Sequence, residues 1–244
     1  MLYLIGTGLY YLNDIPLRAV EILKKTDEVF LEQYTNINDI SFLTKLEGLI
    51  NKKIIIIGRD TVESDELIER AVQRKIALLV PGDPLFATTH VSLIIEAKKR
   101  GVEYKIIHAS SILSSIGETG LSPYKFGAVS SIPIEYENFR PESFFDVIEK
   151  NQRNGLHSLV LLEYKSKNEF VNLEGAMDRI KRINEKRERK IKTEETIAIS
   201  KLGSDEQRIQ KIKNLKGELP PPLAIIIPGE LSSIEKENLN QLIE

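Results

Sequence analysis

Short apolar runs alternate with amphipathic stretches along the first half of the chain. The runs are strand-sized, and they predict strands at 2–5, 28–31, 53–57, 76–80 and 102–107. Between them, apolar side chains recur at helical spacing, which predicts helices near 15–23, 42–50, 65–75 and 90–100. Continuous apolar strands separated by amphipathic helices predict a mostly parallel sheet that helices cover on both faces.

The second half of the chain has a different pattern. Further strands are predicted at 128–134, 158–164, 196–200 and 223–228, and helices near 142–153, 172–190, 205–216 and at the C-terminus. This order favours a second α/β sheet, of mixed strand direction. We therefore expect two α/β domains, an N-terminal one of residues 1–109 and a C-terminal one of residues 110–244.

Composition limits the kinds of protein that the chain can be. Of 244 residues, 41% are hydrophobic and 29% are charged, which suits a globular protein with a real interior. No apolar stretch reaches the length of a membrane span, and the first residues carry no positive leader, so we expect a cytoplasmic protein without a membrane partner. The abundance of Lys, Glu and Ile, with no Cys or Trp, also resembles thermophile composition.

Charge and metal-ligating residues narrow the range of partners. The net charge of −2 provides no global basic field, so we expect no nucleic-acid partner. The basic run at 181–192 is interleaved with glutamates and is typical of a solvated helix. Cysteine is absent and the three histidines are scattered, which predicts that no metal is bound.

A glycine pair follows the first predicted strand. Gly6 and Gly8 could let the backbone approach a ligand, but Tyr11 stands where a dinucleotide-binding fingerprint requires a third glycine. Glu32, at the end of the second strand, could imitate the acidic residue that holds a ribose. A plain tight turn explains the glycine pair equally well, and a conventional Rossmann cofactor site is disfavoured.

The stretch PGDPLFATTH, residues 81–90, follows the most apolar strand. Ligands of open α/β sheets bind outside the carboxyl ends of strands, and this loop is predicted to lie at such an end. Asp83 could contact a ligand there or could cap the turn that Gly82 and Pro84 form. Residue chemistry alone leaves both interpretations open, and an isolated His90 is more often structural than catalytic.

Five motifs occur in order along the chain, namely LYLIGTGL, PGDPLFATTH, HASSI, TGLSPYKFG and PPLAIIIPGEL. Together they resemble the diphthine synthase family, within the tetrapyrrole-methylase group of S-adenosylmethionine-dependent methyltransferases. The resemblance implies two α/β domains with the cofactor S-adenosylmethionine in a cleft between them, and a homodimer. It also implies the reaction, which is methylation, up to trimethylation, of the amino group of a 3-amino-3-carboxypropyl-histidine on translation elongation factor 2.

The resemblance implies cofactor contacts from both halves of the chain. The implied cofactor-binding residues are Leu9, Asp83, Phe86, Ser111, Ile112, Leu162, Leu202 and Leu223. The last three are apolar, so packing in a core predicts the same residue types.

Methyl transfer from a sulfonium is an in-line displacement, to which alignment and exclusion of water can contribute much. We therefore assign no catalytic acid or base. Three alternatives stay open: a related methylase that acts on a tetrapyrrole, one that acts on ribosomal-RNA ribose, and a non-catalytic nucleotide-binding module.

Overall fold

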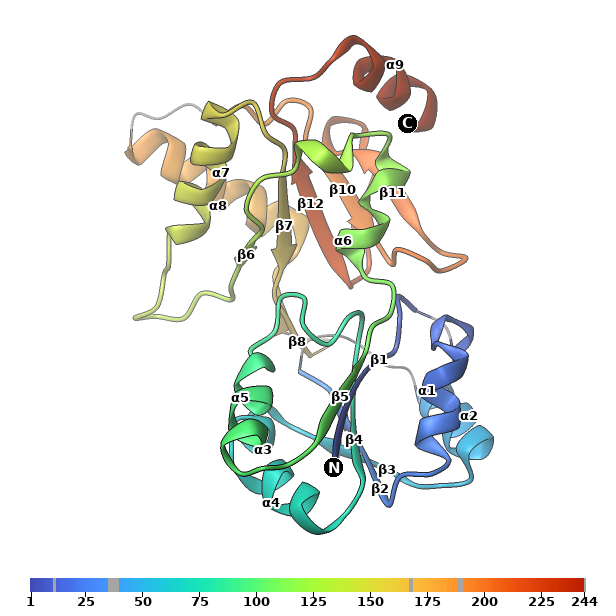
Figure 1. The fold of residues 1–244 in the computed structure, drawn as a ribbon. Helices are drawn as coiled ribbons and strands as arrows, with labels where there is room; N and C mark the ends of the chain where they lie inside the picture. The colour runs from blue at the N-terminus through green and yellow to red at the C-terminus, as the bar shows by residue number, and fades with distance from the viewer. Residues whose placement is uncertain (11, 35–39, 167–168, 188–190, 244) are drawn as a thin grey trace. The chain divides into compact units, whose positions relative to one another are not determined.

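The computed structural model describes residues 1–10, 12–34, 40–166, 169–187 and 191–243. The chain divides into two compact units, Met1–Ser115 and Ile116–Glu244, and each is described by itself (Figure 1). The expected domain boundary between residues 109 and 110 stays a prediction, because compactness alone does not show where an independently folding domain ends.

A five-stranded parallel sheet forms the centre of the first unit. Its strands are β1 (Leu2–Gly6), β2 (Glu28–Glu32), β3 (Ile54–Ile57), β4 (Ile76–Val80) and β5 (Tyr104–Ile107). They lie in the order β3-β2-β4-β1-β5, and every neighbouring pair is parallel. The predicted parallel sheet is therefore confirmed.

Helices cover both faces of this sheet (Figure 1). The helical segments are η1 (Leu12–Asp14), α1 (Leu17–Leu23), α2 (Ile40–Ile50), α3 (Arg59–Val62), α4 (Glu66–Gln73), α5 (Val91–Lys99) and α6 (Ile112–Ser115). Strand β4 shows why both faces are buried. Ile76 and Leu78 pack in one core cluster with α4 and α5, while Ala77 and Leu79 pack in another with α1 and α2. Alternate side chains of a strand point to opposite faces, so a continuous apolar run is required here.

The second unit contains a mixed sheet in the order β11-β10-β12-β7-β6. Its strands are β6 (Ser130–Ile132), β7 (Ser158–Leu162), β10 (Ile197–Ser200), β11 (Arg208–Lys211) and β12 (Leu223–Ile227). Only β6 and β7 pair in parallel among these neighbours, which confirms the predicted mixed sheet. A separate hairpin pairs β8 (Tyr164–Ser166) with β9 (Glu169–Phe170).

The helices of the second unit complete its core. They are η2 (Ile116–Thr119), η3 (Pro123–Lys125), α7 (Ser143–Arg153), α8 (Leu173–Lys186), η4 (Ile212–Asn214) and α9 (Ser233–Leu242). Phe145 of α7 and Ile180 of α8 belong to one buried cluster with Val160 and Ile225 of the sheet. Within the described ranges, no helix is long and apolar enough to cross a membrane.

The helix expected near 205–216 is wrong. Residues Arg208–Lys211 instead form the edge strand β11, which pairs antiparallel with β10 through Ile199 and Ile209, and only the short turn η4 follows. The apolar residues of this stretch do recur at helical spacing, but the unpaired edge of β10 offers backbone hydrogen bonds that outweigh a weak local propensity.

Candidate functional site

The two ligand-facing motifs of the first unit meet at the carboxyl ends of neighbouring strands. Strands β4 and β1 are neighbours at the point where the strand order reverses. After β1 the chain continues to β2, which lies on one side of this pair, and after β4 it continues to β5, which lies on the other side. Such a reversal of strand order opens a crevice at the carboxyl edge of a parallel sheet. The loops that follow β1 and β4 therefore occupy the position where open α/β folds bind ligands.

Backbone hydrogen bonds join these two loops. The Gly8 amide donates to the Gly82 carbonyl at 3.3 Å, and the Gly82 amide donates back to the Gly8 carbonyl at 2.9 Å. Close approach requires glycine at Gly6, since a Cβ there would lie 2.5 Å from the Gly82 oxygen. Gly8 and Gly82 also have φ angles of +84° and +72°, which glycine adopts without strain. Gly6 and Gly8 therefore allow the loop after β1 to pack directly against the loop after β4, in addition to forming a local turn.

Asp83 has two partners inside its own unit. One carboxylate oxygen accepts a hydrogen bond from the Leu85 amide at 3.0 Å, which caps the turn. The other accepts from Nδ1 of His108 at 2.7 Å. His108 is largely exposed, whereas Asp83 is mostly covered. The cap interpretation is therefore realised, and a ligand contact would have to use the remaining lone pairs of the same carboxylate.

A cavity of about 410 Å³ lies beside Asp83. Three of the expected cofactor-binding residues line it, namely Asp83, Phe86 and Ser111. Leu9 and Ile112 are half-buried and lie outside this lining: Leu9 follows Gly8, and Ile112 begins α6. Ser114 also lines it, so the structure groups a carboxylate, an aromatic ring and two hydroxyls around a ligand-sized space.

The three leucines expected from the second half are all buried in the second unit. Leu162 ends β7 and Leu223 begins β12, and both belong to the main core cluster. Leu202 lies just beyond β10, where the Lys201 amide donates to the Pro222 carbonyl. Core packing accounts for Leu162 and Leu223, and Leu202 is buried as well, so the contact of all three with a cofactor stays a prediction.

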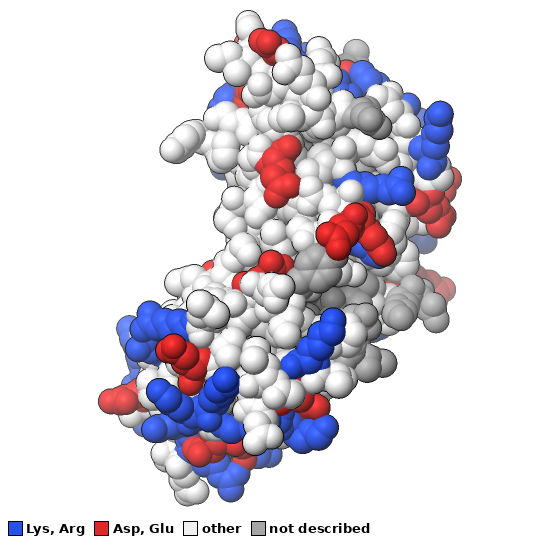
Figure 2. All heavy atoms as spheres, turned by 90° about the vertical axis from the view of Figure 1, so that its right-hand side faces the viewer, with Lys and Arg blue, Asp and Glu red and all other residues white. Residues whose placement is uncertain are grey.

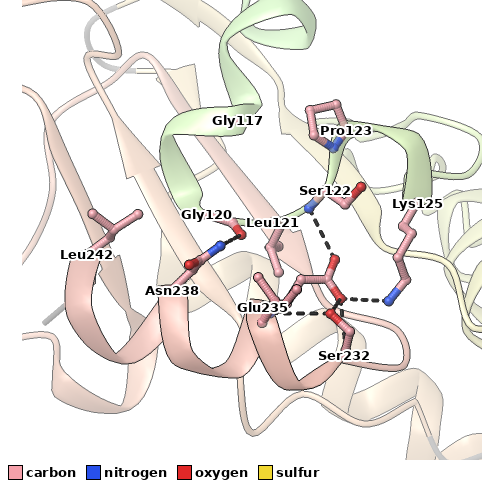
Figure 3. A pocket seen from close by; sticks show the side chains of 11 residues that line it. Gly117, Gly120, Leu121, Ser122, Pro123, Lys125, Ser232, Glu235, Asn238 and Leu242 are labelled. Carbon is pink, nitrogen blue, oxygen red and sulfur yellow. Dashed lines mark hydrogen bonds and ion pairs between the residues drawn. The ribbon is translucent and has the colours of Figure 1, made fainter.

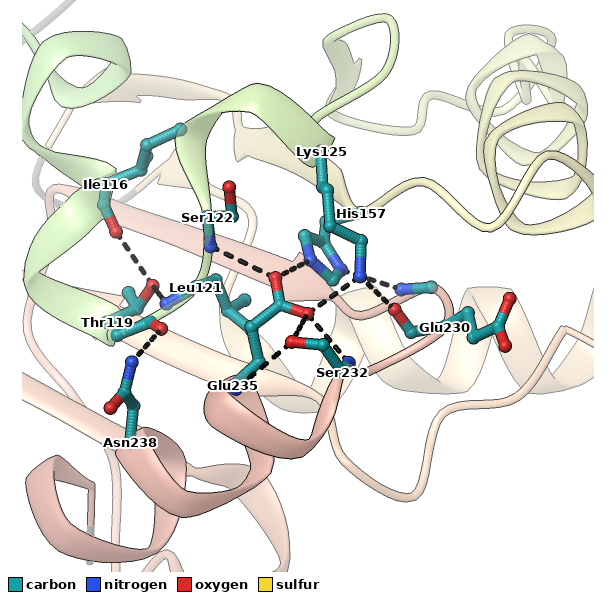
Figure 4. Close-up of polar contacts among 12 residues, drawn as sticks. Ile116, Thr119, Leu121, Ser122, Lys125, His157, Glu230, Ser232, Glu235 and Asn238 are labelled. Atoms are coloured by element: carbon teal, nitrogen blue, oxygen red, sulfur yellow. Dashed lines mark hydrogen bonds and ion pairs between the residues drawn. The ribbon is translucent and has the colours of Figure 1, made fainter.

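The motif TGLSPYKFG is tied to the C-terminal helix by a buried carboxylate (Figure 4). Glu235 of α9 accepts hydrogen bonds from the Ser122 amide at 3.1 Å, the Lys125 ammonium at 2.7 Å and Nε2 of His157 at 2.9 Å. It also forms a capping box with Ser232 at the start of α9. One side chain thereby joins three segments of the second unit.

The charge states in this network follow from its geometry. The Gly229 amide donates to Nδ1 of His157 at 3.0 Å, so the proton of a neutral ring lies on Nε2 and is donated to Glu235. Burial lowers the pKa of His157, although the Glu235 hydrogen bond opposes this. Burial alone would raise the pKa of Glu235, but hydrogen bonds from Lys125, the Ser232 backbone and His157 hold it well below its usual range. The network therefore contains a neutral imidazole and a carboxylate.

A second cavity, of about 620 Å³, lies beside this network (Figure 3). Its lining includes Leu121, Ser122, Lys125, Glu235 and Leu242. Figure 3 shows the Glu235 carboxylate turned toward Ser122, Lys125 and Ser232. Because protein donors already surround this carboxylate, it serves to fix α9 in place. In the described part of the chain, no three His, Asp or Glu side chains are grouped as a metal site would require.

Sequence reasoning missed the partners of both motifs. Ser122 and Glu235 are separated by 113 positions, and no spacing pattern predicts that they meet. Ser232 followed by Glu235 is a recognisable capping-box signature and could have marked the start of α9. Asp83 and His108 both follow parallel strands of one sheet, β4 and β5, so sequence reasoning could have placed both residues at the same edge of that sheet, although not in contact.

Known proteins resemble this chain over its whole length. A model of the Tetrapyrrole (Corrin/Porphyrin) Methylases matches residues 1–216. A diphthine synthase of Methanococcus maripaludis is 38% identical over 253 residues, with 100% of this chain and 99% of the relative covered. One of Methanocaldococcus jannaschii is 38% identical over 255 residues, with the same coverage. A solved diphthine synthase structure superposes with a TM-score of 0.88 at 29% identity, covering 99% of this chain and 95% of that one. The chain therefore belongs to the tetrapyrrole methylase family, in its diphthine synthase branch.

Proposed function

We propose that the protein is an S-adenosylmethionine-dependent methyltransferase that acts in diphthamide biosynthesis. Its substrate is the amino group of a 3-amino-3-carboxypropyl-histidine on translation elongation factor 2, which it methylates up to the trimethyl stage. The observation that carries the proposal is the 38% identity to diphthine synthases along the whole chain. A homodimer in the cytoplasm belongs to the same proposal and rests on the family resemblance.

The residues around the cavity in the first unit fit this cofactor. S-adenosylmethionine carries two positive centres, a ribose and an adenine, and when bound it supplies an activated methyl group. The Asp83 carboxylate complements the positive charge, the Ser111 hydroxyl suits the ribose or the amino-acid portion, and Phe86 offers an apolar surface. The volume of about 410 Å³ lies within the usual range for small-molecule sites.

The contribution of the protein to the reaction is alignment and exclusion of water. The joined loops after β1 and β4 present a rigid edge, so a bound methyl donor would be held in one orientation. The acceptor amine lies next to a free carboxylate, so its pKa is above the value of about 7.7–8.0 that a peptide's terminal α-amino group has, and only a minor fraction is neutral near pH 7.5. The amine can lose its proton to solvent before methyl transfer, so we assign no catalytic base.

Surface charge does not single out an RNA substrate. On the face shown in Figure 2, Lys and Arg side chains are most numerous in the lower part of the view, and Asp and Glu side chains lie among them. A phosphate backbone is held by clustered positive charge. Ribosomal RNA and a tetrapyrrole are therefore included as alternative substrates in the functional assay.

The test is methyl transfer from labelled S-adenosylmethionine to elongation factor 2 that carries the 3-amino-3-carboxypropyl group. We expect label on the modified histidine and none on factor that lacks this group, which is the matched control. Label on RNA or on a porphyrinoid, with none on the factor, would refute the proposed substrate. Calorimetry with the cofactor alone tests the reaction class, because a protein that shows no binding at millimolar cofactor is not such a methyltransferase.

A further inference from the structure

Three polar side chains are grouped beneath the Gly-Asp-Pro loop of the first unit, and the proposed reaction uses none of them. Glu32 ends β2 and is fully buried, and His90 is only 1% exposed. Nε2 of His90 lies 3.8 Å from a Glu32 oxygen and 3.3 Å from the Tyr34 hydroxyl. Burying polar groups of this kind is costly, so such a cluster calls for a structural or functional role.

The protonation of His90 follows from its partners. Its Nδ1 lies 3.0 Å from the Pro84 carbonyl, which can only accept, so Nδ1 carries a proton and donates it. Burial lowers the pKa of His90, so its ring is neutral, and its Nε2 lies 3.3 Å from the Tyr34 hydroxyl, which also hydrogen-bonds to Glu32. The charged groups near Tyr34 are Glu32, Arg59 and Glu63, and burial together with Glu32 raises the pKa of Tyr34. Tyr34 therefore remains a neutral donor.

The loop that His90 contacts is strained. Ala87 has a φ of +54°, in the left-handed region that costs a residue with a Cβ on the order of 1 kcal/mol or more. Two side chains bond the Pro84 carbonyl on the other side of Ala87, namely Thr88 at 2.8 Å and His90 at 3.0 Å. A strained residue persists only where surrounding contacts hold it, and these two bonds close the loop around Ala87.

The conformation of the loop between Gly82 and Ala87 determines which side chains face the cavity. Asp83, Leu85 and Phe86 all line the cavity of about 410 Å³, and all belong to the segment between Gly82 and Ala87. We infer that His90, itself supported by Tyr34, is a positioning residue that keeps this strained loop in the conformation that binds the cofactor. The inference rests on the proposed function only for the identity of that cofactor.

The first experiment compares His90→Leu with His90→Asn in the full chain. The Asn side-chain nitrogen can replace the Nδ1 donor to Pro84, whereas Leu cannot. We expect His90→Leu to raise the Kd for S-adenosylmethionine about tenfold, which is the usual effect of one lost hydrogen bond, and His90→Asn to restore most of the affinity. Hydrogen exchange at the amides of residues 85–90, measured without cofactor, should be faster in His90→Leu alone.

A second experiment uses the strain at Ala87. Glycine adopts positive φ without cost, so Ala87→Gly in the His90→Leu background should recover part of the lost affinity. Leu46→Ala is the control, because Leu46 is buried in the cluster on the opposite face of the sheet. It should lower the melting temperature and leave the Kd unchanged.

The outcomes separate the two proposals. If the unaltered protein does not bind the cofactor, the proposed function fails, and loop exchange still tests the role of His90. If the unaltered protein binds and His90→Leu binds equally well with unchanged loop exchange, the positioning role is overturned. The role is also overturned if His90→Asn behaves as His90→Leu does, or if Ala87→Gly gives no recovery.

Discussion

Asp83 illustrates how one residue can serve both the loop and its ligand. Its two oxygens are engaged by the Leu85 amide and by His108, so its orientation is fixed before any ligand arrives. A carboxylate held in this way loses little side-chain freedom on binding, and preorganisation of this kind favours affinity. The choice between cap and contact, which the sequence left open, is therefore no longer an exclusive one.

Replacement of Asp83 tests this double role. We expect Asp83→Ala to weaken binding of S-adenosylmethionine about tenfold or more, because the change removes both a negative charge and the turn cap. Isothermal titration calorimetry measures the affinity. Asp60→Ala, an exposed position in α3, is the matched control and should leave it unchanged. Equal affinity for Asp83→Ala would leave Asp83 as a turn residue only.

At the scale of elements, the C-terminal helix is attached through one carboxylate. Glu235→Gln keeps the shape but removes the charge that Lys125 and His157 face in a largely buried position. We expect this change to lower the free energy of unfolding by roughly 3 kcal/mol, in the range for breaking a buried charge pair. Urea unfolding measures the loss. Glu237→Gln, at an exposed position of the same helix, should change it by less than about 0.5 kcal/mol. A similar loss for both variants would contradict the role of Glu235.

Two buried histidines, one in each unit, and Glu235 make stability depend on pH. The pKa of His157 and that of His90 are lowered by burial, so the unfolded chain binds protons first as the pH falls. Stability should therefore decline below about pH 6.5, the ordinary value for histidine. Glu235 has a lowered pKa as well, which adds a second loss below about pH 4.5 as its carboxylate is forced to accept a proton. Urea unfolding at a series of pH values checks this, and equal stability at pH 7.5 and pH 5 would contradict it.

Elements also show what could be predicted from sequence. The strands of the first unit were predictable because both of their faces are buried, as in Ile76–Val80, and a short continuous apolar run is typical of such strands. Strand β11 was not predictable, because an exposed edge strand is determined by its neighbour β10 rather than by its own pattern. The same distinction applies to the candidate site. The position of Asp83 could be predicted because it follows a strand, whereas the role of Glu235 depends on contacts between segments that are distant in the sequence.

At the scale of the whole molecule, surface charges are organised into shared ion pairs. Several charged residues have more than one oppositely charged partner, among them Glu28, Arg100 and Glu142. Arg100, for example, contacts Asp65, Glu69 and Glu96. Networks stabilise more than isolated pairs do at high temperature, because the cost of removing water from ions falls on heating. This arrangement agrees with the thermophile-like composition.

We expect the protein to melt above the range of roughly 45–65 °C in which mesophile domains cluster. Arg100→Gln removes the charge from a side chain with three acidic partners and should lower the melting temperature by a few degrees. Arg140→Gln, at an exposed position outside these networks, should have little effect. Because salt screens exposed charges, the difference between the two variants should shrink in 1 M salt. Calorimetric melting measures all of these values, and a melting temperature within the mesophile range, insensitive to Arg100→Gln, would contradict the contribution of the networks.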